Sequence, residues 1–163
     1  MDVIVAGPPE WRLKRPCDYP EQYPLFSERG GATTVLIGGL CVAKMLIVED
    51  EPDVLLMLSM AFEGAHHDVR LAADGDVALT HLRRERFDIV LLDVMMPVLD
   101  GWQVLTTMQG CEQPPPVVVM SAADNVANQT RARDLGAVDF VGKPFQLAQL
   151  IERVEGFVPR GLS

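Results

Sequence analysis

The chain has 163 residues, 48% apolar and 23% charged, a composition that suits a globular protein with a sizeable core. Its formal net charge of -9 disfavours nucleic acid or an anionic membrane as the main partner. Cys17, Cys41 and Cys111 are odd in number, widely spaced and form no CxxC pair. This pattern disfavours a disulfide framework or a zinc site and predicts a reducing, cytoplasmic location.

Residues 1–44 differ from the rest of the chain. They contain as many basic as acidic residues, so the net charge arises from residues 45–163. Five prolines between Pro8 and Pro24 interrupt any helix or central strand. The uncharged stretch 30–43 is too short and too glycine-rich to span a bilayer. We expect residues 1–44 to form a disordered or loosely packed extension, with Met45 as an alternative true start.

From Met45 onward, short apolar runs alternate with amphipathic stretches, a pattern typical of βα units and a parallel sheet. The predicted strands are 45–49, 68–72, 88–92, 116–120 and 138–141. The predicted helices are 52–63, 74–84, 101–109, 125–134 and 146–156. The fold class is therefore α/β, a doubly wound parallel sheet. It occupies residues 45–157, followed by a tail at 158–163.

Polar side chains stand at the carboxyl ends of four predicted strands: Glu49–Asp50, Asp93, Ser121 and Lys143–Pro144. These ends share one edge of a doubly wound sheet, so we expect the side chains to converge. Clustered carboxylates are costly without a cation, and oxygen ligands of this kind suit Mg²⁺. The sequence therefore predicts a magnesium site with a reactive aspartate.

Each of these residues has a chemical rationale. Asp93 could act as a carboxylate nucleophile that accepts a phosphoryl group as a mixed anhydride. Ser121 could hydrogen-bond one phosphoryl oxygen, and Lys143 supplies a positive charge for another oxygen and for Asp93. Taken alone, Asp93 and Ser121 could instead cap the turn or helix that follows each of them.

Four runs in this order resemble the receiver domain of two-component response regulators, over residues 45 to about 157. They are Leu46–Glu51 (LIVEDE), Leu92–Gly101 (LDVMMPVLDG), Met120–Ala122 (MSA) and Gly142–Phe145 (GKPF).

The resemblance implies a flavodoxin-like (βα)5 fold with strand order 2-1-3-4-5. It also implies that a histidine kinase or a histidine phosphotransfer protein phosphorylates Asp93. Asp50, Asp93 and the backbone carbonyl of Met95 would bind Mg²⁺ directly, with Glu49 acting mainly through water.

Three further expectations come from the same resemblance. The peptide bond before Pro144 is a candidate for the cis form. Phe140 matches the aromatic that turns inward as the Ser121 hydroxyl moves toward the phosphoryl group. Met95 and Ala123 lack the carboxylate or amide that orients a hydrolytic water in some receivers, so we expect slow to moderate loss of phosphate.

The predicted function is that of a stand-alone receiver, a switch rather than a metabolic enzyme, because the chain ends soon after the last predicted helix. Phosphorylation would change which downstream protein binds the face formed by residues 125–156, and dimerisation through that face stays open. The alternatives are a scaffold that is never phosphorylated, a dehalogenase-type phosphatase, which Met95 disfavours, and a flavodoxin. His66 and His67 are predicted to be solvated turn residues.

Overall fold

The computed structural model describes residues 35–37 and 40–158. Within this part of the chain, no helix is long and apolar enough to cross a membrane. The described residues form seven strands: β1 Val35–Ile37, β2 Leu40–Val42, β3 Lys44–Val48, β4 Asp68–Ala72, β5 Ile89–Asp93, β6 Val117–Ser121 and β7 Asp139–Gly142. The helices are α1 Pro52–Gly64, α2 Gly75–Arg84, α3 Gly101–Met108, α4 Val126–Asp134 and α5 Leu147–Glu155.

The last five strands form one parallel sheet in the order β4-β3-β5-β6-β7. Counted within the sheet, this is the predicted order 2-1-3-4-5, and every predicted helix and strand lies within one residue of its observed bounds. The doubly wound α/β fold is therefore confirmed.

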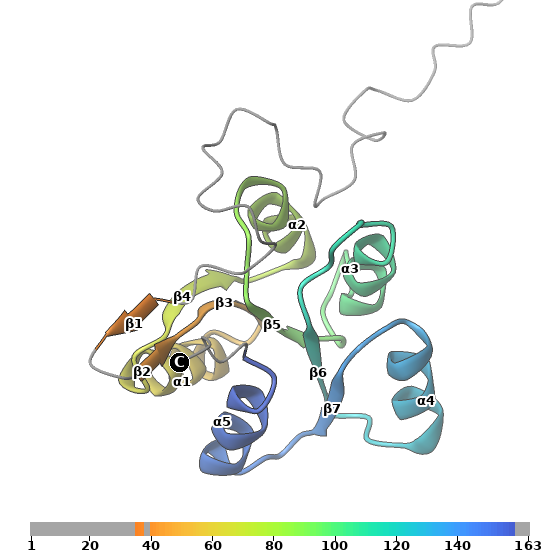
Figure 1. The fold of residues 1–163 in the computed structure, drawn as a ribbon. Helices are drawn as coiled ribbons and strands as arrows, with labels where there is room; N and C mark the ends of the chain where they lie inside the picture. The colour runs from red at the N-terminus through yellow and green to blue at the C-terminus, as the bar shows by residue number, and fades with distance from the viewer. Residues whose placement is uncertain (1–34, 38–39, 159–163) are drawn as a thin grey trace, which may run out of the picture.

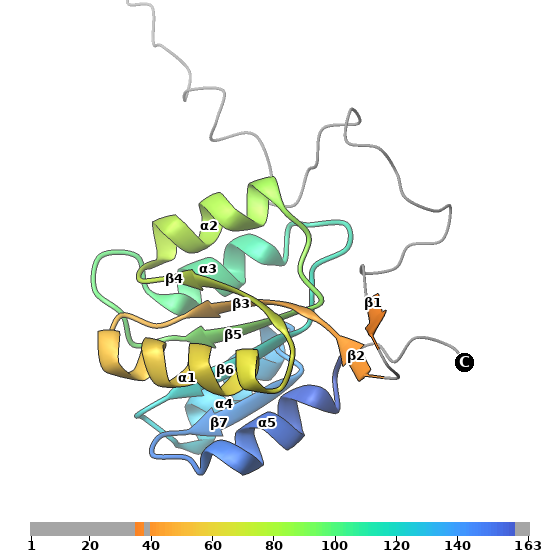
Figure 2. The same cartoon turned by 90° about the vertical axis from the view of Figure 1, so that its left-hand side faces the viewer.

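Side-chain alternation along the strands builds a core on each face of the sheet. Along β3, Leu46 and Val48 pack into one cluster with side chains of α2 and α3, whereas Met45 and Ile47 pack into the other with α1 and α5. Figure 1 shows α2, α3 and α4 on one side of the sheet and α1 and α5 on the other, and in Figure 2 α1 lies in front of the strands. Strands buried on both faces explain the continuous apolar runs in the sequence.

The prediction for residues 1–44 falls mostly on residues outside the described part of the chain. Within it, β1 pairs antiparallel with β2, which was not predicted. Ala43 is fully buried and Lys44 already belongs to the parallel sheet, so the packed fold begins just before Met45.

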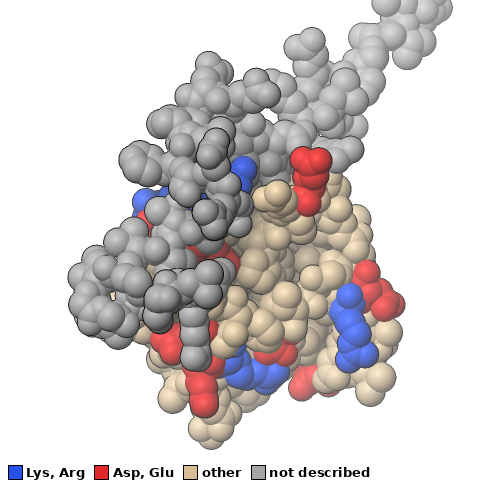
Figure 3. All heavy atoms as spheres, viewed as in Figure 1, with Lys and Arg blue, Asp and Glu red and all other residues tan. Residues whose placement is uncertain are grey.

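Two expectations about individual side chains are wrong. Cys111 is disulfide-bonded, against the expectation of reduced cysteines. His67 is 7% exposed rather than solvated, because its ring lies against Phe62 and its Nδ1 accepts a hydrogen bond from the Ala43 amide. On the face shown in Figure 3, the described charged side chains are scattered and mixed in sign rather than gathered into a basic patch.

Candidate functional site

The sheet register brings the predicted site residues to one edge. Val48 is paired with Leu92, Asp93 with Met120, and Ser121 with Gly142. Glu49 and Lys143 directly follow β3 and β7, and Asp93 and Ser121 are the last residues of β5 and β6. The parallel arrangement thus gathers side chains that lie up to 94 positions apart in sequence.

Lys143 bridges two carboxylates at this edge. Its Nζ donates hydrogen bonds to Glu49 Oε2 at 2.7 Å and to Asp93 Oδ2 at 3.0 Å. Both acceptors are buried, with side chains 0% and 3% exposed, while the lysine side chain is 18% exposed. Buried charged groups need partners, and the Lys143 ammonium is the partner of both carboxylates.

The electrostatics of this group follow from burial and charge. Burial raises the pKa of Glu49, and the nearby Asp93 charge adds to the effect, while Lys143 and the Glu51 amide oppose it. Burial alone would lower the pKa of Lys143, but its hydrogen bonds to Glu49 and Asp93 and their negative charges outweigh it and raise that pKa. The ammonium therefore stays protonated at neutral pH.

A third carboxylate completes an acidic cluster. Oxygen atoms of Glu49, Asp50 and Asp93 all lie within 4.8 Å of one another. Hard oxygen donors at this spacing are the ligands that Mg²⁺ takes in proteins. One ammonium cannot neutralise three carboxylates, so the residues present fit a divalent cation.

The second oxygen of Asp93 is oriented by the backbone. Asp93 Oδ1 accepts a hydrogen bond from the Met95 amide at 2.9 Å. Gly101, the first residue of α3, lies against the same loop: a Cβ added there would sit 2.7 Å from Val94 Cα and would collide with the Asp93 carbonyl oxygen. Only glycine fits this approach, so α3 starts in direct contact with the backbone of Asp93.

Ser121 reaches the site edge but serves the local turn. Its side chain is fully buried, and its Oγ accepts a hydrogen bond from the Ala123 amide at 3.1 Å. Its carbonyl accepts one from the Lys143 amide at 2.8 Å, which ties β6 to the lysine loop. The alternative that Ser121 caps the next helix is wrong, because Asn125 caps α4.

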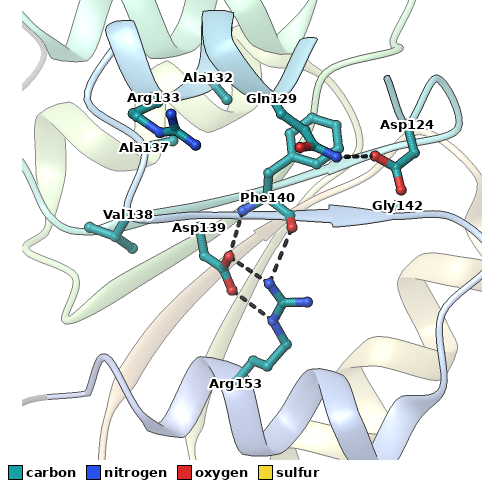
Figure 4. A pocket seen from close by; sticks show the side chains of 10 residues that line it. All are labelled: Asp124, Gln129, Ala132, Arg133, Ala137, Val138, Asp139, Phe140, Gly142 and Arg153. Carbon is teal, nitrogen blue, oxygen red and sulfur yellow. Dashed lines mark hydrogen bonds and ion pairs between the residues drawn. The ribbon is translucent and has the colours of Figure 1, made fainter. Parts of the chain in front are cut away.

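The other predicted residues occupy different places. Met95 is 56% exposed beside Asp93, and the Lys143–Pro144 peptide bond is cis. Phe140 is half-buried and packs against the core. It lines a cavity of about 420 Å³, which is formed by residues of α4, β7, α5 and the neighbouring loops (Figure 4).

Sequence reasoning missed two contacts around the site. A Cβ at Gly142, next to Lys143, would meet the Asp124 side chain, so the loop before α4 packs directly on the lysine strand. The Arg131 guanidinium lies over the Trp102 ring, 4.4 Å from its centroid, and connects α4 to the first turn of α3. The glycine before Lys143 was the only signal in the sequence for either contact.

The whole arrangement defines a receiver domain. The family model of the response regulator receiver domain matches residues 45–155, so the chain belongs to that family. Such domains work in two-component systems as signalling switches rather than as metabolic enzymes, and they bind Mg²⁺ in an acidic cleft.

Individual relatives agree with this assignment. The transcriptional regulatory protein PrrA of Mycobacterium tuberculosis is 36% identical over 122 residues, covering 75% of this chain and 52% of PrrA. The response regulator MprA of the same species is 37% identical over 119 residues, covering 72% of this chain and 51% of MprA. This chain thus spans about half the length of the curated relatives it matches.

Solved structures give the same picture. The receiver domain of the Francisella response regulator 1452 is 30% identical with a TM-score of 0.68, covering 71% of this chain and 95% of that one. The receiver domain of the sensor histidine kinase PA1611 of Pseudomonas aeruginosa is 26% identical with a TM-score of 0.65, covering 72% and 98%. That structure holds a magnesium ion in its active-site cleft.

Proposed function

We propose that Asp93 is the phosphoacceptor of a two-component phosphorelay. The observation that carries this proposal is the pair of hydrogen bonds from Lys143 Nζ to Asp93 and Glu49, beside the acidic cluster. One carboxylate oxygen of Asp93 attacks the phosphorus of a phosphohistidine, the P–N bond breaks, and the imidazole leaves with the electron pair. The donor is a histidine kinase or a histidine phosphotransfer protein.

Mg²⁺ is the cofactor that this donor set suits. Asp50, Asp93 and the Met95 carbonyl would hold it directly, and Glu49 would act through water. When bound, it supplies positive charge for the phosphoryl oxygens. The residues of the chain do the rest: the Met95 amide orients Asp93, and Lys143 and Ser121 provide an ammonium and a hydroxyl for the phosphoryl oxygens.

Phosphorylation shifts an equilibrium between two conformations and so changes partner binding. As Ser121 moves toward the phosphoryl group, Phe140 turns inward and alters the face formed by residues 125–156. Two observations support this: Phe140 lines the cavity on that face, and only one residue of α4 is buried. The target is a downstream protein or a second copy of the chain.

We propose that the chain consists of an extension at 1–44, a receiver domain at 45–157 and a tail at 158–163. We also propose that the protein acts in the cytoplasm. The transcriptional regulators among the relatives are about twice as long as the matched region. We propose that this receiver is a phosphorylation-dependent switch whose output is a protein contact. Because Met95 and Ala123 carry no group to orient water, phospho-Asp93 loses its phosphate slowly to moderately, and a half-life of seconds contradicts this.

The test is phosphorylation in vitro. The full chain is incubated with Mg²⁺ and acetyl phosphate, or with Mg²⁺ and beryllofluoride, while the fluorescence of buried Trp102 is followed. We expect a spectral change that is absent in Asp93→Asn and retained in Asp76→Asn, a matched change at an exposed carboxylate on α2. If the parent protein takes up no phosphate under these conditions, it is a scaffold of receiver fold instead.

A further inference from the structure

A second cluster of buried polar groups lies at the amino-terminal ends of the parallel strands, opposite the acidic cluster. His67 and Asp88 immediately precede β4 and β5 and are 7% and 2% exposed. Ala43 and Lys44, where the chain runs from β2 into β3, lie between them. The phosphorylation chemistry uses none of these groups.

The side chains of His67 and Asp88 accept hydrogen bonds from the backbone of Ala43 and Lys44. The Ala43 amide donates to His67 Nδ1 at 3.3 Å, and the Lys44 amide donates to Asp88 Oδ2 at 2.6 Å. Their carbonyl oxygens accept from the amides of Asp68 and Asp88, at 2.9 and 2.8 Å. The attachment of this segment therefore depends on the protonation of two buried titratable groups.

The groups that surround the His67 imidazole come from several helices and strands. On the α5 side, Glu155 Oε1 lies 3.6 Å from His67 Nε2, and on the β5 side Asp88 is close enough for its pKa to respond to the histidine charge. Helix α1 contributes the Phe62 ring, 6.1 Å away, and the Lys44 ammonium is paired with Glu85 at 2.7 Å. Burial raises the pKa of Asp88, against the effects of its Lys44 amide bond and of the Lys44 and His67 charges.

The hydrogen bond to Ala43 fixes the tautomer of the neutral ring. Nδ1 must be unprotonated to accept, so the proton is on Nε2, which points toward Glu155. A second proton can go only to Nδ1. Once it is there, two N–H groups face each other and the Ala43 bond is lost, while the imidazolium gains the attraction of Glu155 and Asp88.

We propose that His67 makes the attachment of the chain entering β3 sensitive to pH, by exchanging the Ala43 hydrogen bond for charge interactions with Asp88 and Glu155. Histidine changes charge in the pH range that cells experience. Acidification then loosens Ala43, the residue directly after β2, and strengthens the contact with the end of α5. This proposal does not depend on phosphorylation of Asp93.

Amide hydrogen exchange measured by NMR tests it. From pH 8 to pH 5, after correction for intrinsic exchange, we expect the protection of Ala43 to fall about fivefold relative to Val48, the loss of one hydrogen bond. In Glu155→Gln the fall moves to lower pH because a stabilising negative charge is gone. His66→Gln, at the exposed neighbour in the same turn, behaves like the parent. A constant protection ratio across this range overturns the proposal.

His67→Gln should remove the pH dependence, but that variant could fail to fold because the site is buried. Nitrogen NMR of the parent protein decides without any substitution. We expect His67 at pH 8 to carry its proton on Nε2 and its neutral nitrogen at Nδ1. A ring with its proton on Nδ1 at pH 8 cannot accept from Ala43, and that result overturns the proposal by itself.

Discussion

Helices α3 and α4 cover the same face of the sheet but are held in different ways. Five residues of α3 are buried: Gly101, Trp102, Val104, Leu105 and Met108. In α4 only Ala132 is buried, and Val126 at its start is 78% exposed. Helix α3 is thus anchored by apolar packing next to Asp93, and α4 is not.

Polar contacts take the place of packing in α4. Asn128 Nδ2 donates to the Ala123 carbonyl at 2.9 Å, Gln129 Nε2 to Asp124 at 2.7 Å, and Gln109 Nε2 of the α3–β6 loop to the Asp134 carbonyl at 3.2 Å. Such bonds can be exchanged for bonds to water at small cost, whereas buried apolar area cannot. From this comparison we predict that α4, rather than α3, moves in the switch proposed above.

We expect the largest loss of stability from a substitution in the apolar face of α3. Leu105→Ala removes a side chain that is 2% exposed, and we expect it to lower the free energy of unfolding by about 2–5 kcal/mol. Val126→Ala in α4 should change it by less than about 0.5 kcal/mol. Urea unfolding followed by circular dichroism measures both, and similar losses for the two variants would mean that α4 is anchored as firmly as α3.

The sequence predicts features that depend on local patterns better than contacts between residues far apart in the chain. Apolar periodicity is local, so it predicted the five strands of the parallel sheet and the five helices. The residues at the strand ends predicted the site, because parallel strands bring their carboxyl ends together whatever the loops do. For this reason the sequence alone predicts that Lys143 lies beside Asp93.

The failures are contacts between elements that carry no periodic signal. His67 was predicted to be a solvated turn residue because no third metal ligand lies near it in the sequence. Its burial depends on the fold, which places Ala43 and Asp88 around it. The stacking of Arg131 on Trp102 joins residues 29 positions apart in two helices, and neither residue type indicates it. The pairing of β1 with β2 was missed although Gly38–Gly39 between apolar runs is a hairpin signal.

The N-cap of α4 gives the next largest effect. Asn125 Oδ1 accepts from the Asn128 amide at 2.9 Å, and Asn125→Ala should cost the helix about 1 kcal/mol. Because α4 is weakly packed, the loss should appear mainly as faster amide exchange within α4. The matched variant Asp100→Ala, at the cap of α3, should instead lower global stability. If Asn125→Ala lowers the urea midpoint as much as Asp100→Ala does, α4 unfolds only together with the rest of the domain.

The contact between the two helices comes next. Arg131→Ala removes the cation over the Trp102 ring and should cost about 0.5–1 kcal/mol. Because Trp102 is only 6% exposed and adjoins the Asp93 loop, its emission should change in this variant, and α4 should exchange faster. Arg133→Ala, one position from Ala132 in the same helix, is the control. An equal spectral change in both variants would show that Trp102 does not report the Arg131 contact.

The smallest effect concerns α2, the third helix on this face, whose end is held by ion pairs. Burial alone would raise the pKa of Glu85, but its bonds to Lys44 and His81 outweigh it and lower that pKa below 4.5. The carboxylate therefore contributes stability above about pH 4.5, roughly 0.2–1 kcal/mol, and loses it as the pH falls through the lower folded value. The difference in melting temperature between the parent and Glu85→Gln should shrink from pH 7 to pH 3.5. The control Glu112→Gln, at an exposed carboxylate, should show no such trend. A melting-temperature difference for Glu85→Gln that stays constant with pH would mean that the substitution acts through packing rather than charge.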